Sequence, residues 1–421
     1  MARLRIAFFT NAFPQSSEPF IELQASELVR RGHDVTVFGL GGVPVTTSSS
    51  PQAVRDRLEA RFHNVAVPAS MPHRLGAAMA ATARTLRKAS LGKLPLVRPL
   101  VFRRTWLDLS AVFHGELVAG QGPFDILHCQ FATLGEHVLK LTRAGLVRGA
   151  MVVHFRGYDI TEVVQSQGHR VYDELWAKVP GFVANCENFR QRAITIGCPE
   201  SRIDVVGSGI DLANFPYRPP KLLDERAIKL LAVGRLSPRK GFHSLIAAVA
   251  LLIKSGLKIE LVIVGEGSER DRLEQMIRSH NLTAKIKLAG RLPHSAIRQL
   301  LDESHIFVAP SQTCPLGGAD APLNTIKEAM AVGIPVCATR HGGIPELVEE
   351  AITGTLAAED NPADLAAAIR RLVDLSPVWA SIAETARKRV ETDYDISAVT
   401  DRLLTVYRSA IARATLERKA I

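Results

Sequence analysis

The chain has little of several features that mark whole classes of protein. Only five of its 421 residues are cysteine, and they form neither a CxxC pair nor a Cys/His cluster with metal-site spacing. Such scattered thiols predict a reducing compartment and argue against a disulfide-stapled fold. No apolar run approaches the ~20 residues of a membrane span. The first five residues lead directly into a short apolar strand and predict no signal peptide, so we expect a cytoplasmic protein.

Acidic residues are missing from one long segment. The net charge is +10, and between Glu59 and Asp108 nine basic residues occur without an acidic one. Within residues 71–107 the basic residues are interleaved with Leu, Val, Phe and Trp, which favours a peripheral contact with anionic lipid at the inner face of the cell membrane. The alternative is a helical pair with a solvated basic face. Few aromatic residues and no recognisable nucleic-acid-binding fold argue against a nucleic-acid partner.

Strands and helices alternate in the N-terminal half. An apolar strand at residues 4–9 is followed by a helix near 20–31, which Gly32 ends, and by a second strand at 34–38. This order predicts a parallel sheet. Further strands are expected at residues 125–129, 150–154, 181–184 and 203–206.

The same alternation restarts after a Pro-rich linker at residues 213–222. Strands are expected near residues 229–233, 259–264, 284–288, 306–309 and 335–338. The sequence therefore predicts an α/β protein with two Rossmann-like, doubly wound domains, at residues 1–212 and 223–394, that face a central cleft. A C-terminal helix at 395–421 should pack back on the first domain. In such sheets ligands bind beyond the carboxyl ends of the strands.

Two glycine-containing segments follow strands of the second domain. In GRLSPRKG, residues 234–241, Arg235, Arg239 and Lys240 can converge on an anion at a helix N-terminus; a solvated basic turn is the alternative. The segment VGEG at residues 264–267 lacks the third glycine of a dinucleotide fingerprint, and a tight turn explains it better than a phosphate loop.

Two acids and a glycine pair follow later strands. A helix should begin near Pro322, so that Asp320 precedes it and Glu328 lies within it, where both can accept hydrogen bonds from ligand hydroxyls. Helix capping and a surface position are the alternatives. The glycine pair of HGGIPE, residues 341–346, leaves backbone N–H groups free for a ligand or serves as a structural turn.

In this order the C-terminal motifs resemble those of the retaining glycosyltransferases of family 4, which have the GT-B fold. The family pattern runs GR-x4-KG, VGxG, PS, an acid separated by seven residues from Glu, and GGxPE. In the N-terminal half, HFRGYD (154–159) resembles the HGxD turn of the family, in a form typical of bacterial exopolysaccharide enzymes. PFIELQ (19–24) and SGID (208–211) resemble its TFIxxE and GID segments.

The resemblance implies roles for individual residues. Arg235 and Lys240 should bind the donor diphosphate, Glu328 the ribose and Asp320 the transferred sugar, which His154 should face from the first domain. The remaining donor-binding candidates are Gly234, Gly265, Gly267, Arg291, Ser311, Asn324 and Thr325. The acceptor-side candidates are Phe13, Glu18, Arg156 and Asp159.

The expected function is transfer of a sugar from a UDP- or GDP-sugar to a glycan or lipid-linked acceptor in surface polysaccharide synthesis. Retention of configuration is implied by the resemblance alone. No convincing DxD segment ends a strand, so neither a catalytic metal nor a cofactor is expected. One alternative is a nucleotide-sugar epimerase of the same fold, although no acid/base set for it stands out. A non-catalytic sugar-nucleotide-binding protein is the other.

Overall fold

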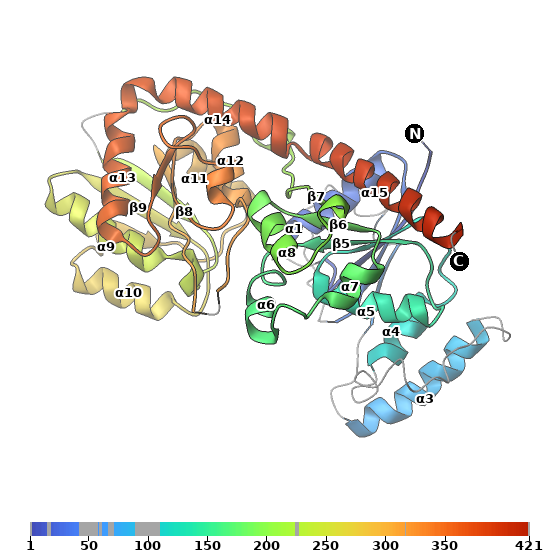
Figure 1. Cartoon of the computed structure of the whole chain (residues 1–421). Helices are drawn as coiled ribbons and strands as arrows, with labels where there is room; N and C mark the ends of the chain where they lie inside the picture. Colours follow the sequence, from blue (N-terminus) through green and yellow to red (C-terminus); the bar gives the residue numbers. More distant parts are fainter. Residues whose placement is uncertain are drawn as a thin grey trace.

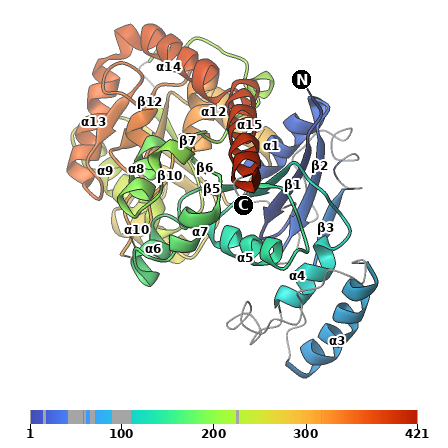
Figure 2. The same ribbon diagram turned by 45° about the vertical axis from the view of Figure 1, so that its right-hand side comes forward.

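The computed structural model describes residues 2–14, 18–41, 58, 61–65, 71–88, 110–223, 227–315 and 317–419. These residues form two parallel sheets, which lie in separate lobes with helices packed around them (Figure 1). In the view turned by 45° in Figure 2 the two lobes partly overlap. We call the lobe built on the first sheet the first domain and the other the second domain.

The first sheet has the strand order β3-β2-β1-β4-β5-β6-β7. In its centre, Ile6 of β1 lies beside Val35 of β2 and Ile126 of β4. Because the strand order reverses between β1 and β4, the loops after these strands diverge and leave room for a ligand. Its strands are β1 (Arg5–Thr10), β2 (Asp34–Gly39), β3 (Phe62–Asn64), β4 (Ile126–Cys129), β5 (Ala150–Phe155), β6 (Gly181–Ala184) and β7 (Ile203–Val205).

The second sheet repeats this plan with the order β10-β9-β8-β11-β12-β13. Leu230 of β8 lies between Leu261 of β9 and Ile306 of β11, where the strand order again reverses. Its strands are β8 (Ile228–Val233), β9 (Ile259–Val264), β10 (Ile286–Leu288), β11 (Ile306–Ala309), β12 (Val336–Thr339) and β13 (Thr355–Ala357). The predicted α/β class and paired doubly wound sheets are confirmed. The three-residue strands β3 and β13 were not predicted.

The helices pack on the sheets through apolar faces. In the first domain they are α1 (Pro19–Arg30), α3 (Met71–Lys88), α4 (Ser110–Val118), α5 (Ala132–Arg143), α6 (Glu162–Gln167), α7 (Asp173–Lys178) and α8 (Glu187–Thr195). Those that follow are α9 (Phe242–Lys254), α10 (Arg270–Ser279), α11 (His294–Glu303), α12 (Asn324–Val332), α13 (Pro362–Asp374), α14 (Trp379–Tyr394) and α15 (Ile396–Lys419). Short 3-10 turns occur at Glu200–Arg202, Leu212–Asn214, Pro238–Lys240, Ile344–Glu346 and Ser376–Val378.

The C-terminal helices run from one lobe to the other (Figure 1). Helix α14 packs on α12 of the second domain, and α15 contacts α1, β5 and β6 of the first. At the junction between them Asp395 forms a bridge with Ile210, so the returning chain lies beside the outgoing linker. The Tyr407 hydroxyl of α15 then reaches the Nδ1 atom of His128 at 2.6 Å, inside the first domain.

The loops at the carboxyl edge of the second sheet touch one another through their backbones. Gly241, with φ +63°, leaves no room for a side chain, because a Cβ atom there would lie 1.9 Å from the carbonyl oxygen of Pro310. At Gly265, with φ +147°, a Cβ atom would lie 1.8 Å from the carbonyl oxygen of Gly234. The loop after β8 is therefore packed against the loops after both β9 and β11.

We expect Gly265→Ala to lower the free energy of unfolding by about 1–3 kcal/mol more than Gly256→Ala does, measured by urea denaturation. Both alanines would be strained by a positive φ, which destabilises the folded state by about 1–3 kcal/mol. Gly256 has φ +94°, and a Cβ atom there would have nothing within 4 Å, so only Gly265→Ala adds a collision with backbone. Equal losses in the two variants would show that the loops move apart freely.

Candidate functional site

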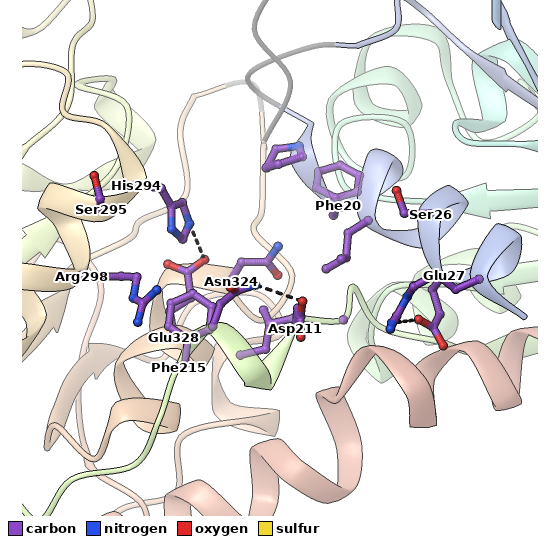
Figure 3. Close-up of a pocket in the computed structure, with 16 residues that line it drawn as sticks. Phe20, Ser26, Glu27, Asp211, Phe215, His294, Ser295, Arg298, Asn324 and Glu328 are labelled. Atoms are coloured by element: carbon purple, nitrogen blue, oxygen red, sulfur yellow. Dashed lines mark hydrogen bonds and ion pairs between the residues drawn. The ribbon is translucent and has the colours of Figure 1, made fainter. Parts of the chain in front are cut away.

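Two adjoining cavities open at the carboxyl edge of the second sheet. The β8 cavity, of about 540 Å³, is lined by Gly234, Arg235, Gly265, Arg291 and further residues of the loops after β8, β9 and β10. The interdomain cavity, of about 420 Å³, is lined by residues of α1, the linker, α11 and α12 (Figure 3). His294 lines both. One ligand of suitable length could therefore occupy both cavities.

The β8 cavity holds two arginines without partners. Arg235 lies in the loop directly after β8, and Arg291 follows β10; both are exposed. Among the residues that the structure describes, neither side chain forms a hydrogen bond or an ion pair. A guanidinium group offers several donors in a fixed plane, so two unneutralised guanidinium groups favour an anionic ligand such as phosphate.

Lys240 differs from Arg235 because its side chain already forms an ion pair. Its Nζ atom donates to Asp320 Oδ2 at 2.8 Å, and Arg239 Nε lies 3.5 Å from Asp320 Oδ1. Burial acts to raise the pKa of Asp320, but the charges of Lys240 and Arg239 outweigh it and hold this pKa below its ordinary value. The Asp320 carboxylate is therefore ionised and acts as the counterion of two cations.

The backbone of Asp320 joins it to the glycine pair. Its N–H donates to His341 Nε2 at 3.0 Å, and its carbonyl oxygen accepts from the N–H of Gly343 at 2.9 Å. Helix α12 begins at Asn324, two residues later than expected, because Leu323 at its N-cap is extended. Pro322 is therefore not in the first helical turn, and Asp320 faces Lys240 instead of capping the helix.

Glu328 lines the interdomain cavity from α12, one turn after Asn324 (Figure 3). Its Oε1 atom lies 3.7 Å from His294 Nε2, and this interaction raises the pKa of His294. The ring of Phe215, in the linker, meets His294 edge-on at 5.8 Å between centroids. Sequence reasoning missed His294 and Phe215, because neither belongs to a recognisable motif.

Lys327 was also missed, since a lysine inside a helix is normally assigned to solvent. Its side chain is buried, and Nζ donates to the carbonyl oxygen of Ser208 at 2.7 Å and to Asn324 Oδ1 at 3.1 Å. It lies 4.4 Å above the ring of Tyr394, and burial lowers its pKa to about 7. Lys327 therefore ties α12 to the turn after β7 in the first domain.

Arg156 and Glu18 face this region from the first domain. Arg156 directly follows β5 and is buried, and its guanidinium lies 4.7 Å from the ring of Phe20, which lines the interdomain cavity. Burial raises the pKa of Glu18, while Arg156 and Arg235 act to lower it. Cations from both domains therefore act to lower the pKa of Glu18.

His154 lies in the core, and the structure gives no support to its expected contact with the sugar. It lies within β5, is 0% exposed and hydrogen-bonds through Nε2 to Asn185 Oδ1 at 2.8 Å. Its ring stacks on His128 at 5.5 Å, and burial holds the pKa of both histidines well below the ordinary value. Aligning HGxD on Gly157 and Asp159 puts Arg156, not His154, at the position of the histidine.

Two acceptor-side candidates are also buried and engaged within the first domain. Phe13 is 4% exposed and packs edge-on against Phe62 in the core of the first domain. Asp159 is fully buried, and its carboxylate accepts hydrogen bonds from the N–H groups of Ala132, Arg156, Gly157 and Ile160 at 2.9–3.1 Å. Both of its oxygens are thus used to hold the turn after β5.

Five donor-side candidates line neither cavity: Lys240 and Asp320, which pair with each other, and Gly267, Ser311 and Thr325. Ser311 is 1% exposed, and its carbonyl oxygen accepts a hydrogen bond from Thr339. Gly267 packs against the backbone of Leu236, and Thr325 lies on α12 between the lining residues Asn324 and Glu328. The structure gives Gly267 and Ser311 packing roles between loops.

Direct contacts join the two domains beside these cavities. The carboxylate of Glu346, at the end of HGGIPE, accepts hydrogen bonds from the N–H groups of Glu187 and Asn188 at 2.8 Å each. It therefore caps the N-terminus of α8 in the first domain. Arg239 NH1 donates to Glu162 Oε1 of α6 at 2.9 Å.

We expect Asp320→Asn to destabilise the protein at neutral pH and to cost progressively less as the pH falls below about 4. The folded pKa of Asp320 lies below the unfolded one, so its stabilising effect is complete above the unfolded value and is lost through the folded one. Urea denaturation from pH 7 to pH 3.5 measures the difference from wild type. Asp173→Asn, which removes an exposed partner of Arg170, is the control and should change little at any pH. A loss for Asp320→Asn that does not vary with pH would contradict the assignment.

Comparisons with known proteins agree with this architecture. A family model described as Glycosyltransferase Family 4 matches residues 18–214, and one described as Glycosyl transferases group 1 matches residues 215–389. The chain is 29% identical to the amylovoran biosynthesis glycosyltransferase AmsK of Erwinia amylovora, over 93% of this chain and 96% of that protein. It is 28% identical to the putative colanic acid biosynthesis glycosyltransferase WcaL of Escherichia coli, over 96% of this chain and all of that protein.

Solved structures share the fold at lower identity. HepE of Anabaena in complex with UDP-glucose superposes with a TM-score of 0.68 at 19% identity, covering 97% of this chain and 100% of that one. The glycosyltransferase of Rickettsia africae superposes with a TM-score of 0.67 at 17% identity, covering 97% and 99%. Since the two family models together span almost the whole chain, the protein belongs to the family 4 glycosyltransferases and has the GT-B fold.

Proposed function

We propose that this glycosyltransferase transfers a sugar from a UDP- or GDP-sugar to a glycan or lipid-linked acceptor during the synthesis of a bacterial surface polysaccharide. The observation that carries the proposal is the pair of unpartnered arginines, Arg235 and Arg291, in a cavity that adjoins the Glu328 carboxylate. A sugar nucleotide carries a diphosphate beside a ribose, which this combination suits. AmsK and WcaL, the relatives that match nearly the whole chain, are named for exopolysaccharide synthesis.

In the proposed complex the base and the diphosphate enter the β8 cavity and the ribose hydroxyls meet Glu328. Arg235 and Lys240 bind the diphosphate, so Lys240 would share its charge between the ligand and Asp320. Asp320 faces the sugar, where its carboxylate can accept hydrogen bonds from hydroxyl groups. UDP-glucose in the related fold of HepE supports a nucleotide-sugar donor.

During transfer the bond between the anomeric carbon and the phosphate oxygen breaks, and its electron pair remains on the leaving diphosphate. Fixed cations in the cleft stabilise this charge in the transition state. The acceptor hydroxyl attacks from the same face and gives its proton to the leaving phosphate oxygen, so configuration is retained. This scheme uses protein cations in place of a metal ion.

The test is a panel of UDP-, GDP- and dTDP-sugars, scored by thermal shift, donor turnover and epimerisation. A donor at a hundredfold excess over its Kd should stabilise the protein by about 2.7 kcal/mol.

We expect Glu328→Gln to bind the free nucleoside diphosphate more weakly, because a ribose hydroxyl donates more strongly to a carboxylate than to an amide. Glu303→Gln, at the far end of α11, removes an exposed carboxylate and is the matched control. Epimerisation, or binding without turnover, would support the alternative functions; equal affinities in Glu328→Gln and wild type would remove Glu328 from the ribose site.

We also propose that the protein is cytoplasmic and binds the inner face of the membrane through the basic segment 71–107. Among the described residues, no helix has the length and apolarity to span a membrane. Helix α3, the described part of the segment, projects from the first domain in both views (Figures 1 and 2). Met79 is 73% exposed on it, while Arg84 pairs with Glu116 of α4. The rest of the segment, residues 89–107, lies outside the described residues.

Replacing five basic residues of this segment with Gln should release the protein from vesicles that contain anionic lipid. The five are Arg84, Arg87, Lys88, Arg103 and Arg104. Each basic residue near such a surface contributes roughly 1 kcal/mol, and salt screens the effect. Co-sedimentation with the vesicles at low and high salt measures it.

A control with the same change in net charge replaces five basic residues of the second domain with Gln. These are Lys254, Arg272, Arg278, Lys285 and Lys287, all exposed. The control should sediment like wild type and both variants should keep activity on a short soluble acceptor. Equal release of both variants, or no sedimentation of the wild type, would leave the segment as a solvated basic face.

A further inference from the structure

Arg156 is a buried cation whose hydrogen-bond partners are all neutral. Its guanidinium donates to side-chain oxygens of Gln130 at 3.1 Å, Gln24 and Asn185 at 3.3 Å, and Ser208 at 3.4 Å. The ring of Phe20 covers it at 4.7 Å. Within the part of the chain that the structure describes, no carboxylate forms an ion pair with it.

This arrangement is costly. Taking a charged group out of water without an ionic partner costs several kcal/mol, and burial lowers the pKa of Arg156 to about 10. Glu18 and Asp159 act on it only from a longer distance, and both oxygens of Asp159 are occupied by backbone N–H groups. A neutral side chain could bind the same amides without this cost. A buried guanidinium that is held by neutral hydrogen-bond partners indicates that its positive charge has a function.

The field of Arg156 reaches the space between the domains. Phe20, which covers the guanidinium, lines the interdomain cavity. Arg156 and Arg235, from opposite domains, both act on Glu18, and Arg156 also contributes to the lowered pKa of Lys327 on α12. An anion in the cleft would therefore experience positive charge from the first domain as well as from the second.

We propose that Arg156 is a positioning residue that supplies a fixed positive charge, from the first domain, to the diphosphate of the bound sugar nucleotide. The inference rests on the proposed function. The neutral side chains around Arg156 accept hydrogen bonds from its N–H groups. Arg156 therefore contributes its charge and its contact with Phe20. As the bond to the anomeric carbon breaks, negative charge grows on the diphosphate, and a cation that needs no rearrangement stabilises the transition state more than the ground state.

Gln24→Glu tests the charge without removing Arg156. The Gln24 side-chain oxygen lies 3.3 Å from NH2 of Arg156, so a carboxylate at this position would form an ion pair and cancel the charge. Gln24→Met is the matched neutral variant. We expect kcat of Gln24→Glu to fall at least about tenfold below that of Gln24→Met, with equal or higher thermal stability. Affinity for the nucleoside diphosphate should fall and affinity for the nucleoside alone should not.

Gln130→Glu repeats the test from another side, at the oxygen that accepts from Arg156 Nε, and serves if Gln24→Glu does not fold. Carboxylate variants that fold, turn over as fast as their Met counterparts and bind the diphosphate equally well would overturn the role of Arg156. The wild type then still transfers sugar and the proposed function stands. If the wild type neither binds nor turns over any nucleotide sugar, the proposed function fails, and this inference fails with it.

Discussion

Asp320, in the loop after β11, is bonded to two other loops on the donor side of the cleft. Its carboxylate holds Lys240 and Arg239 of the loop after β8, and its backbone holds His341 and Gly343 of the loop after β12. It lies in the segment after β11, so it joins loops that follow three neighbouring strands. The charges remain paired while largely shielded from water, a condition under which removal of one partner is strongly destabilising. The geometry of the cleft therefore depends on this ion pair.

Paired and unpaired cations have separate roles in this arrangement. Lys240 and Arg239 are paired with Asp320 and Glu162, whereas Arg235 and Arg291 have no partner among the described residues and Arg156 has only neutral ones. The paired cations keep the loops together without a ligand. The unpaired ones leave positive charge that a ligand anion can meet. An anionic ligand is attracted to a site that is already assembled, which limits the reorganisation needed for binding.

Sequence patterns were sufficient where a signal is repeated along the chain, and insufficient where it depends on which way one side chain points. Alternating strands and helices predicted both sheets, and glycine motifs after strands predicted the cleft edge. His154 and Arg156 are two residues apart, and the sequence allows either of them to face the cleft. Because β5 ends at Phe155, His154 lies in the core and Arg156 lies at the cleft edge. Lys327 could not be recognised, because its partner Ser208 is distant in the sequence.

The donor loops also hold the first domain, so donor binding and domain position are coupled. Glu346, three residues after Gly343 in the same loop, caps α8 of the first domain, and Arg239 binds both Asp320 and Glu162 of α6. A diphosphate that draws Lys240 away from Asp320 leaves Arg239 as the main counterion of that carboxylate and weakens its bond to Glu162. The contact at α8 contains none of these cations and would persist. Donor charge would thus loosen the contact between Arg239 and Glu162 and leave those made by Glu346 and Lys327, which is a physical route by which nucleotide binding can change the relative position of the domains.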